Sequence, residues 1–249
     1  MSASIALVTG GTSGIGKMTA KILAAKGATV ILSGRRATEG AQVVEEIRAA
    51  GGNGQFVRCD VRDEAAIRAM IEGIVAEHGR LDWAANCAAV SLETKLLADS
   101  ASEAFQTMID INLMGVYHSM KHEIQQMQRQ GGGSIVNISS VAGIKGSPMF
   151  APYAATKFGV VGMTKSAALE YAAQQIRINA VAPGAVRTEP LERLFATGQF
   201  DEAAAAAMHP IKRIGEPQEI AHGIAWLLSD EASFVTGHVL SMDGGLNAQ

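Results

Sequence analysis

The sequence is poor in the residues that stabilise small secreted proteins. Only two of its 249 residues are cysteines, Cys59 and Cys87, and their spacing fits neither a disulfide framework nor a zinc-binding motif. We interpret both as small buried side chains in a reducing cytoplasm. The six histidines include no HExxH motif. His118 and His122 are four residues apart without a third ligand, so we predict surface or interface residues and no metal site.

Long apolar runs and blocks of one charge are also absent. The apolar runs are much shorter than the ~20 residues that span a bilayer, and Gly, Ser and Thr interrupt them. The opening residues, MSASIALVTGG, lack the charged leader and apolar core of a signal peptide. The net charge is −3 with both signs spread along the chain. These features argue against a membrane protein and against a nucleic-acid partner.

The sequence does contain short apolar runs that alternate with longer helical patterns. Hydrophobic residues make up 48%, which is enough for a sizeable core. Several runs are nearly continuous, as expected for strands buried on both faces. The alternation predicts an α/β fold in which helices cover both faces of a parallel sheet. The predicted strands are 5–9, 29–33, 55–60, 82–86, 134–139, 176–181 and 238–242, and the predicted helices are about 14–26, 39–50, 63–78, 102–128, 152–173 and 217–229.

No linker divides the chain, so we predict one domain over residues 1–249. The one long irregular stretch is 184–216, in which a five-alanine run follows Asp201 and Glu202 and favours a helix. Long insertions in compact domains often cover a site, so we predict a substrate lid here. Four apolar side chains would line the pocket beneath it: Met149, Phe150, Phe195 and Met208.

The first predicted strand runs into a glycine-rich turn, TGGTSGIG, at residues 9–16. Glycine lets the backbone turn sharply, and the following helix offers free N–H groups and its positive end to a pyrophosphate. The spacing differs from G-x-G-x-x-G, and an ordinary glycine-rich turn remains the alternative. The predicted dinucleotide site at this turn comprises Gly10, Thr12, Ser13, Gly14, Ile15 and Gly16.

The end of the second strand indicates which dinucleotide binds. Gly34 stands where an acidic residue would bind a free 2′-hydroxyl, and Arg35 and Arg36 follow. Guanidinium groups suit a 2′-phosphate, so we predict NADP(H) over NAD(H) unless both arginines are solvated surface charges. Asp60, followed by Val61 at the end of the third strand, either meets the adenine amino group or caps the next helix.

A tyrosine and a lysine stand four residues apart in APYAATKFG, residues 151–159. On a helix, Tyr153 and Lys157 share one face, although such a pair alone is weak evidence. NISS ends the fifth strand with Ser139 and Ser140, and DIN places Asn112 on the preceding long helix. The carboxyl ends of the strands of a doubly wound sheet converge on one crevice, which favours a shared site.

These motifs together resemble a classical short-chain dehydrogenase/reductase. TGGTSGIG, DIN, NISSVAG, YAATK and PGAVRT have the order and separations of that family, from Ile5 to the C-terminal MDGG. The resemblance implies a single doubly wound Rossmann-type domain with about seven parallel strands in the order 3-2-1-4-5-6-7. It also implies a nicotinamide cofactor, hydride transfer between an alcohol and a carbonyl, and a homotetramer.

The resemblance assigns a role to each catalytic residue. Tyr153 is the general acid/base, and Lys157 and the nicotinamide charge are expected to lower its pKa from about 10. Lys157 also binds the nicotinamide ribose. Ser140, thirteen residues before the tyrosine, holds the substrate oxygen, while strand alternation points Ser139 to the other side. Asn112 holds a water that links Lys157 to solvent, or simply bonds locally.

The resemblance also extends the cofactor site to the loop after the sixth strand. Pro183 and Gly184 pass the nicotinamide, and Val186 lies in the same loop. Thr188 bonds the carboxamide, caps the following helix, or does both.

One stretch departs from the family pattern. The family commonly has Asn-Asn-Ala-Gly after the fourth strand, whereas this chain has NCAA at 86–89. Asn86 and Ala88 are retained and are predicted to contact the cofactor. Ala89 costs free energy only if the turn requires a positive φ. Cys87 has no His or Lys nearby in the sequence to activate it, which argues against a nucleophile.

We therefore predict an NADPH-dependent carbonyl reductase, or the reverse alcohol dehydrogenase, for a small to medium, fairly apolar substrate. One alternative is a reductase of a carrier-bound 3-oxoacyl group, with Lys145, Arg187 and Arg193 as candidates for a basic entrance. Another is a non-catalytic dinucleotide sensor, which would have no reason to keep a complete catalytic group.

Overall fold

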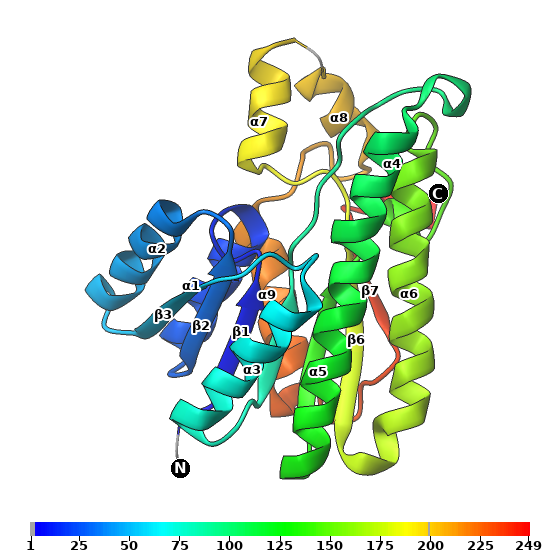
Figure 1. The fold of residues 1–249 in the computed structure, drawn as a ribbon. Coiled ribbons are helices and arrows are strands. Elements are labelled where there is room, and N and C mark those ends of the chain that lie inside the picture. Colours follow the sequence, from blue (N-terminus) through cyan, green and yellow to red (C-terminus); the bar gives the residue numbers. More distant parts are fainter. Residues whose placement is uncertain (1–2, 199) are drawn as a thin grey trace.

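A computed structural model describes residues 3–198 and 200–249 (Figure 1). Its strands form one parallel sheet in the order β3-β2-β1-β4-β5-β6-β7, which confirms the predicted fold class. Each strand lies within two residues of its predicted position. The strands are β1 (Ile5–Thr9), β2 (Thr29–Gly34), β3 (Asn53–Arg58), β4 (Trp83–Asn86), β5 (Gly133–Ile138), β6 (Ile176–Pro183) and β7 (Val239–Met242).

Helices cover both faces of the sheet. The strands are apolar on both faces: Ala6 and Val8 of β1 join one hydrophobic cluster, and Ile5 and Leu7 join the other. Helices α1 (Gly14–Ala25), α2 (Ala37–Ala49) and α9 (Pro217–Leu228) pack on the first cluster. Helices α3 (Glu64–His78), α5 (Gly115–Gln130) and α6 (Ala151–Tyr171) pack on the second. The sheet is therefore the middle layer of three (Figure 1).

The predicted continuous helix over 102–128 is wrong in one respect. It consists of α4 (Ser102–Met108), a wider π-helical turn at Ile109–Met114, and α5. Such turns insert an extra residue into a helix and often mark functional positions. This one contains Asn112, one of the predicted catalytic residues.

The predicted lid contains two short helices rather than one. The alanine run forms α8 (Glu202–Met208), and the Asp201 carboxylate caps it by accepting from the N–H groups of Ala203 and Ala204 at 2.8 and 3.3 Å. Helix α7 (Glu189–Ala196) falls in the stretch predicted to be irregular. Both helices lie above the carboxyl ends of the strands (Figure 1). Among the described residues, no helix is long and apolar enough to cross a membrane.

Candidate active site

Tyr153 and Lys157 lie on one face of α6, whose first turn contains Pro152, a residue suited to a helix start. Lys157 is only 1% exposed, and its Nζ donates to the carbonyl oxygen of Ile138 at 2.9 Å. That carbonyl ends β5. The same Nζ lies 5.7 Å from the centre of the Tyr153 ring. The end of β5 therefore fixes the ammonium beside the phenol.

The two serines after β5 point to different sides, as predicted from strand alternation. Ser139 is buried, and its hydroxyl donates to the carbonyl of Lys157 at 3.1 Å. Ser140 is partly exposed, accepts from the N–H of Ala142 at 3.1 Å, and lies close enough to Tyr153 to affect the pKa of its phenol. Ser140 is thus the serine on the side of the Tyr153 phenol, while Ser139 anchors α6 to the strand.

The ionisation of this group is governed by burial. Burial raises the pKa of Tyr153 to about 12, and the nearby Ser140 hydroxyl opposes that increase. Burial also lowers the pKa of Lys157 to about 8. The expected lowering of the phenol's pKa is therefore not present in the protein alone, because burial disfavours the phenolate more than the Ser140 hydroxyl favours it.

Asn112 is fully buried in the π-helical turn and bonds residues that are distant in the sequence. Its Oδ1 accepts from the N–H of Val90 at 2.8 Å, and its Nδ2 donates to the Val90 carbonyl at 2.8 Å. A longer contact of 3.3 Å joins Nδ2 to Thr156 Oγ1 on α6. The side-chain amide therefore ties the loop after β4 to α6. The predicted binding of a water by this residue stays a prediction.

The glycine turn after β1 has the geometry of an anion cradle. Gly10 and Gly14 have φ of +67° and +51°, which is the left-handed region that favours glycine. A Cβ at Gly10 would lie 2.7 Å from the backbone of Ala88, so the NCAA segment abuts the turn directly. Ser13, at the N-cap of α1, makes no side-chain capping bond, so its side chain satisfies none of the free N–H groups in the first turn of α1. The turn fits a pyrophosphate.

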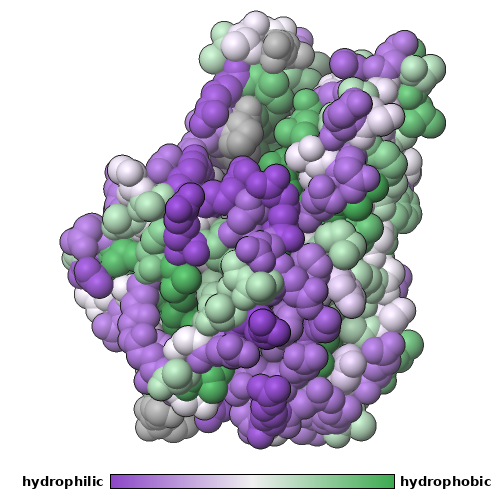
Figure 2. All heavy atoms as spheres, viewed as in Figure 1, coloured by the Kyte–Doolittle hydropathy of each residue, from purple (hydrophilic) through white to green (hydrophobic). Residues whose placement is uncertain are grey.

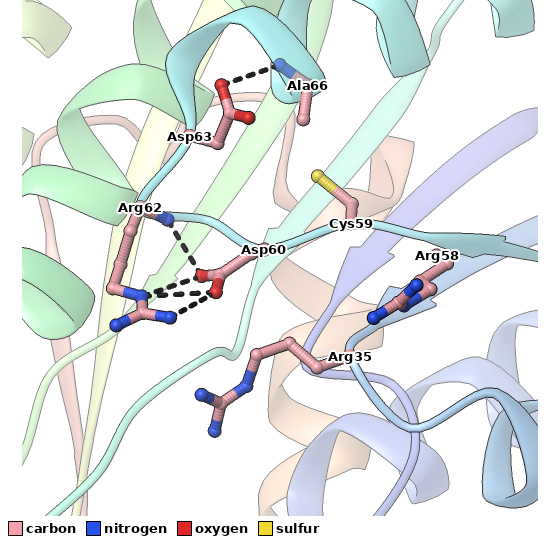
Figure 3. Close-up of a pocket in the computed structure, with 7 residues that line it drawn as sticks. All are labelled: Arg35, Arg58, Cys59, Asp60, Arg62, Asp63 and Ala66. Carbon is pink, nitrogen blue, oxygen red and sulfur yellow. Dashed lines mark hydrogen bonds and ion pairs between the residues drawn. The ribbon is translucent and has the colours of Figure 1, made fainter.

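Arg35 lines a pocket of about 500 Å³ beside the end of β2 (Figure 3). Arg58 and Arg62 line it too, which sequence analysis missed. Asp60 is paired with Arg62, with the shortest contact at 2.6 Å. Asp63, not Asp60, caps α3 by accepting from the N–H of Ala66, so the capping alternative for Asp60 is wrong. Three arginines and two aspartates therefore line the pocket, and Arg62 neutralises one of the aspartates, Asp60.

Arg36 lies on a different side of the site from Arg35. Its Nη2 donates to Thr12 Oγ1 at 3.0 Å and to Ser13 Oγ at 2.6 Å, across the glycine turn. It also lies 3.9 Å from Glu189, the first residue of α7. Arg36 is therefore not a freely solvated charge; it links the glycine turn to the lid.

The loop between β6 and α7 brings its predicted residues to the glycine turn. A Cβ at Gly14 would lie 3.2 Å from Thr188 Cγ2. Thr188 occupies the N-cap position of α7, but its side chain makes no capping hydrogen bond. Val186 is buried, and so is Val61, whose side chain belongs to the core beneath the site.

The NCAA departure is harmless to the backbone. Ala89 is not among the described residues with positive φ. Cys87 donates its backbone N–H to Thr9, and burial raises the pKa of its thiol to about 12, so it is an unreactive thiol. Asn86 is buried and donates to Glu123 and Asn137, both at 3.0 Å. These hydrogen bonds connect the end of β4 to α5 and to β5.

Known proteins resemble this chain over its whole length. A family model described as enoyl-(acyl carrier protein) reductase matches residues 10–247. A 2,5-dichloro-2,5-cyclohexadiene-1,4-diol dehydrogenase from Sphingobium indicum is 42% identical over 100% of this chain and 98% of its own. A cyclohexanol dehydrogenase from Acinetobacter sp. is 40% identical over 98% of this chain and 95% of its own. The structure of ElxO with NADP bound is 38% identical and covers both chains fully, with a TM-score of 0.95.

The chain belongs to the short-chain dehydrogenase/reductase family. As a member, it is an oxidoreductase that acts on CH–OH groups with a nicotinamide dinucleotide. The residues of the glycine turn and the arginine pocket described above fit such a cofactor.

The backbone conformation of Met149 was not predicted from the sequence. Met149 has a φ of +67°, a rare conformation for a residue with a side chain, and its carbonyl accepts from the N–H of Lys95 at 3.0 Å. It is 44% exposed, and next to it the Phe150 ring packs edge-on against Tyr153 at 6.4 Å. The proximity of Met149 and Phe150 to Tyr153 was predicted, whereas the backbone strain gave no sequence signal.

The remaining predictions concern histidines and bases. His118 is buried, so its predicted surface or interface position is wrong; His122 lies 3.1 Å from Glu64. Over residues 3–198 and 200–249, no group of three or more His, Cys, Asp or Glu is arranged to hold a metal ion.

Of the predicted basic entrance, Lys145 donates to the Leu246 carbonyl and Arg187 is paired with Glu202 and Glu216.

Proposed function

We propose that the protein interconverts alicyclic secondary alcohols and the corresponding ketones, using NADP(H). The proposal is supported by the placing of Tyr153 beside Ser140 after β5, together with exposed apolar side chains on and near α7 and α8, which lie above the carboxyl ends of the strands (Figure 1). Figure 2 shows hydrophobic surface between the lid helices and the top of α4. The exposed apolar residues of this region are Leu92, Leu96, Leu97, Met149, Leu194, Met208 and Ile211.

An apolar substrate with a compact ring suits this surface. Burial of apolar area supplies binding free energy without requiring charged partners. The two relatives described above are named as dehydrogenases of alcohols on six-membered rings. The carrier-bound alternative is less well supported, because two of its three candidate bases already have partners within the protein.

The cofactor would be held by three groups of residues. The turn from Gly10 to Gly16 would hold the pyrophosphate, Arg35 with its pocket the 2′-phosphate, and the loop from Pro183 to Thr188 the nicotinamide end. We expect Asp60, Val61, Asn86 and Ala88 to contact the cofactor between these groups. Bound NADP(H) supplies or accepts the hydride.

The protein's own residues handle the proton. In the reducing direction Ser140 orients the carbonyl oxygen of the substrate, and Tyr153 donates its phenolic proton to that oxygen. A pKa of about 12 keeps this proton in place at neutral pH. In the oxidising direction the phenolate must form, and a positive charge on the nicotinamide side of the site then lowers the barrier. Lys157 adds to that stabilisation when protonated.

Replacement of Tyr153 with Phe tests the proposal. The variant should lose turnover by about 100- to 10,000-fold, the usual contribution of general acid–base catalysis. Its affinity for NADPH, measured by fluorescence titration, should be unchanged because the ring remains. The assay follows NADPH oxidation with cyclohexanone and substituted cyclohexanones, and NADP reduction with the matching alcohols. Near-normal turnover in this variant would overturn the mechanism.

We further propose that the protein is a cytoplasmic homotetramer. Both cysteines are free, as is usual in a reducing compartment. Phe158 and Leu169, on one face of α6, are 46% and 86% exposed, and Tyr117 on the neighbouring α5 is 43% exposed. Large apolar side chains exposed on two helices that cover the same face of the sheet favour contact with another copy.

A further inference from the structure

His209 is a buried histidine at the end of α8 whose ring nitrogens both have backbone partners. It is 2% exposed. Its Nδ1 lies 2.8 Å from the carbonyl oxygen of Ala205, and its Nε2 lies 3.1 Å from the N–H of Ala185. A carbonyl only accepts and a backbone N–H only donates. Nδ1 therefore carries the proton, Nε2 is the acceptor, and the imidazole is neutral.

The imidazole packs directly against the loop after β6. A Cβ at Gly184 would lie 2.5 Å from Nε2, so only glycine lets the ring approach this closely. Further along, the Ala185 carbonyl accepts from Gly215 N–H at 2.8 Å, and Arg187 N–H donates to Gly215 at 2.8 Å. The segment from His209 to Gly215, which follows α8, thus holds the loop after β6 by three hydrogen bonds. One of them is made by the His209 side chain.

We propose that His209 is a positioning residue for the nicotinamide half of the cofactor. It fixes the Gly184–Ala185 peptide through the acceptor at Nε2, and through Nδ1 it attaches that peptide to the C-terminal end of α8. The position of the loop after β6 thereby depends on the position of α8 in the lid. This inference rests on the proposed function, which places the nicotinamide beside this loop.

Two substitutions separate the two ring nitrogens. In His209→Gln the amide oxygen reaches the place of Nε2 and accepts from Ala185. In His209→Asn the amide nitrogen takes the place of Nδ1 and donates to Ala205, while the N–H of Ala185 loses its acceptor. Both variants remove the ring, and each is the control for the other.

The expected result is a difference confined to the nicotinamide end. His209→Asn should bind NADPH about tenfold more weakly than His209→Gln, as expected for one unpaired N–H. Both variants should bind 2′,5′-ADP, which lacks the nicotinamide, as tightly as wild type. His209→Gln should also recover most of the wild-type kcat, whereas His209→Asn should not. Equal NADPH affinities in the two variants, or an equal loss for 2′,5′-ADP, would show that His209 only supports the fold.

A measurement on the wild-type chain decides the question if either variant fails to fold. The ¹⁵N chemical shifts of His209 should report a neutral ring protonated at Nδ1, and the Nε2 resonance should move on addition of NADP but not of 2′,5′-ADP. A cationic ring, or no response to NADP that is otherwise seen to bind, overturns the inference. If wild-type protein binds no NADPH at all, the proposed function itself has failed.

Discussion

At the scale of residues, buried polar side chains form a row beneath the cofactor edge of the sheet. Thr9 is in register with Ser33 on one side and with Asn86 on the other, and Asn86 is in register with Asn137. All four are at most 1% exposed. Glu123 of α5 packs on this row and is fully buried, with one oxygen bonded to Asn86 and the other without a partner in the described part of the chain. Burial raises the pKa of Glu123 to about 8.

Glu123 makes stability depend on pH. Its pKa in the folded state, about 8, exceeds the ordinary value of 4.5, so the folded protein holds a proton that the unfolded chain releases between these values. The stability of wild type should therefore fall as pH rises from about 4.5 to 8. Glu123→Gln keeps an acceptor for Asn86 and removes this penalty.

Denaturant unfolding of both proteins at pH 5, 7 and 9 measures the effect. The gain in unfolding free energy from Glu123→Gln should grow with pH and reach on the order of a few kcal/mol above pH 8. A difference between the two proteins that does not change with pH would show that Glu123 titrates normally in the fold.

Arg35 should set the cofactor preference. Arg35→Asp places a carboxylate where we expect the 2′-phosphate, so the ratio of kcat/KM for NADPH over NADH should fall by at least about tenfold. Arg48→Asp makes the same change of charge on an exposed part of α2 and is the control. An unchanged ratio in Arg35→Asp would contradict the assignment of the arginine pocket.

The residues of the site were predictable to different degrees. Tyr153, Lys157 and Ser140 follow from spacing because a helix and a strand end have fixed geometry. Arg58 and Arg62 were not predicted as site residues, because they come beside Arg35 only through the pairing of β3 with β2.

At the scale of elements, the strands were the easiest to predict. Each is a short run of apolar residues buried on both faces, and that pattern survives in the sequence. The π-helical turn was not predicted, and within it Asn112 bonds the Val90 peptide, a contact between segments that are distant in the sequence. Helix α7 was missed because it is short and mostly exposed. Local composition therefore predicts which residues are buried better than it predicts contacts between distant segments.

Asn112 should be intolerant even of an isosteric change. Asn112→Asp retains the acceptor for the Val90 N–H but places an anion against the Val90 carbonyl, at a buried position. The unfolding free energy should drop by about 3 kcal/mol. Gln42→Glu, the same chemical change on the exposed surface of α2, should alter it by less than about 0.5 kcal/mol. Equal effects of the two substitutions in denaturant unfolding would mean that the amide does not hold the loop.

At the scale of the whole molecule, the doubly wound topology gathers the site from strands that are far apart in the sequence. Phe158 and Leu169 are exposed on α6, which is why we expect this helix to be covered by another copy. Leu169→Glu should dissociate the tetramer into smaller species in light scattering. Leu96→Glu, an equivalent change beside the lid, should leave the mass unchanged. A tetramer that survives Leu169→Glu, or a monomeric wild type, would exclude this interface.

The packing at the end of β2 also bears on how this protein's cofactor preference can evolve. A Cβ at Gly34 would lie 2.9 Å from Thr12 Cγ2, so the methyl group of Thr12 occupies the space that an acidic side chain would need. Thr12→Ser removes that methyl and retains the hydroxyl that Arg36 contacts. Exchange of Thr12 for serine should therefore relieve this contact before Gly34→Asp is introduced, whereas the reverse order passes through a strained intermediate. We therefore expect the order of the two mutations to decide whether a route from the proposed NADP(H) preference toward NAD(H) avoids that strain.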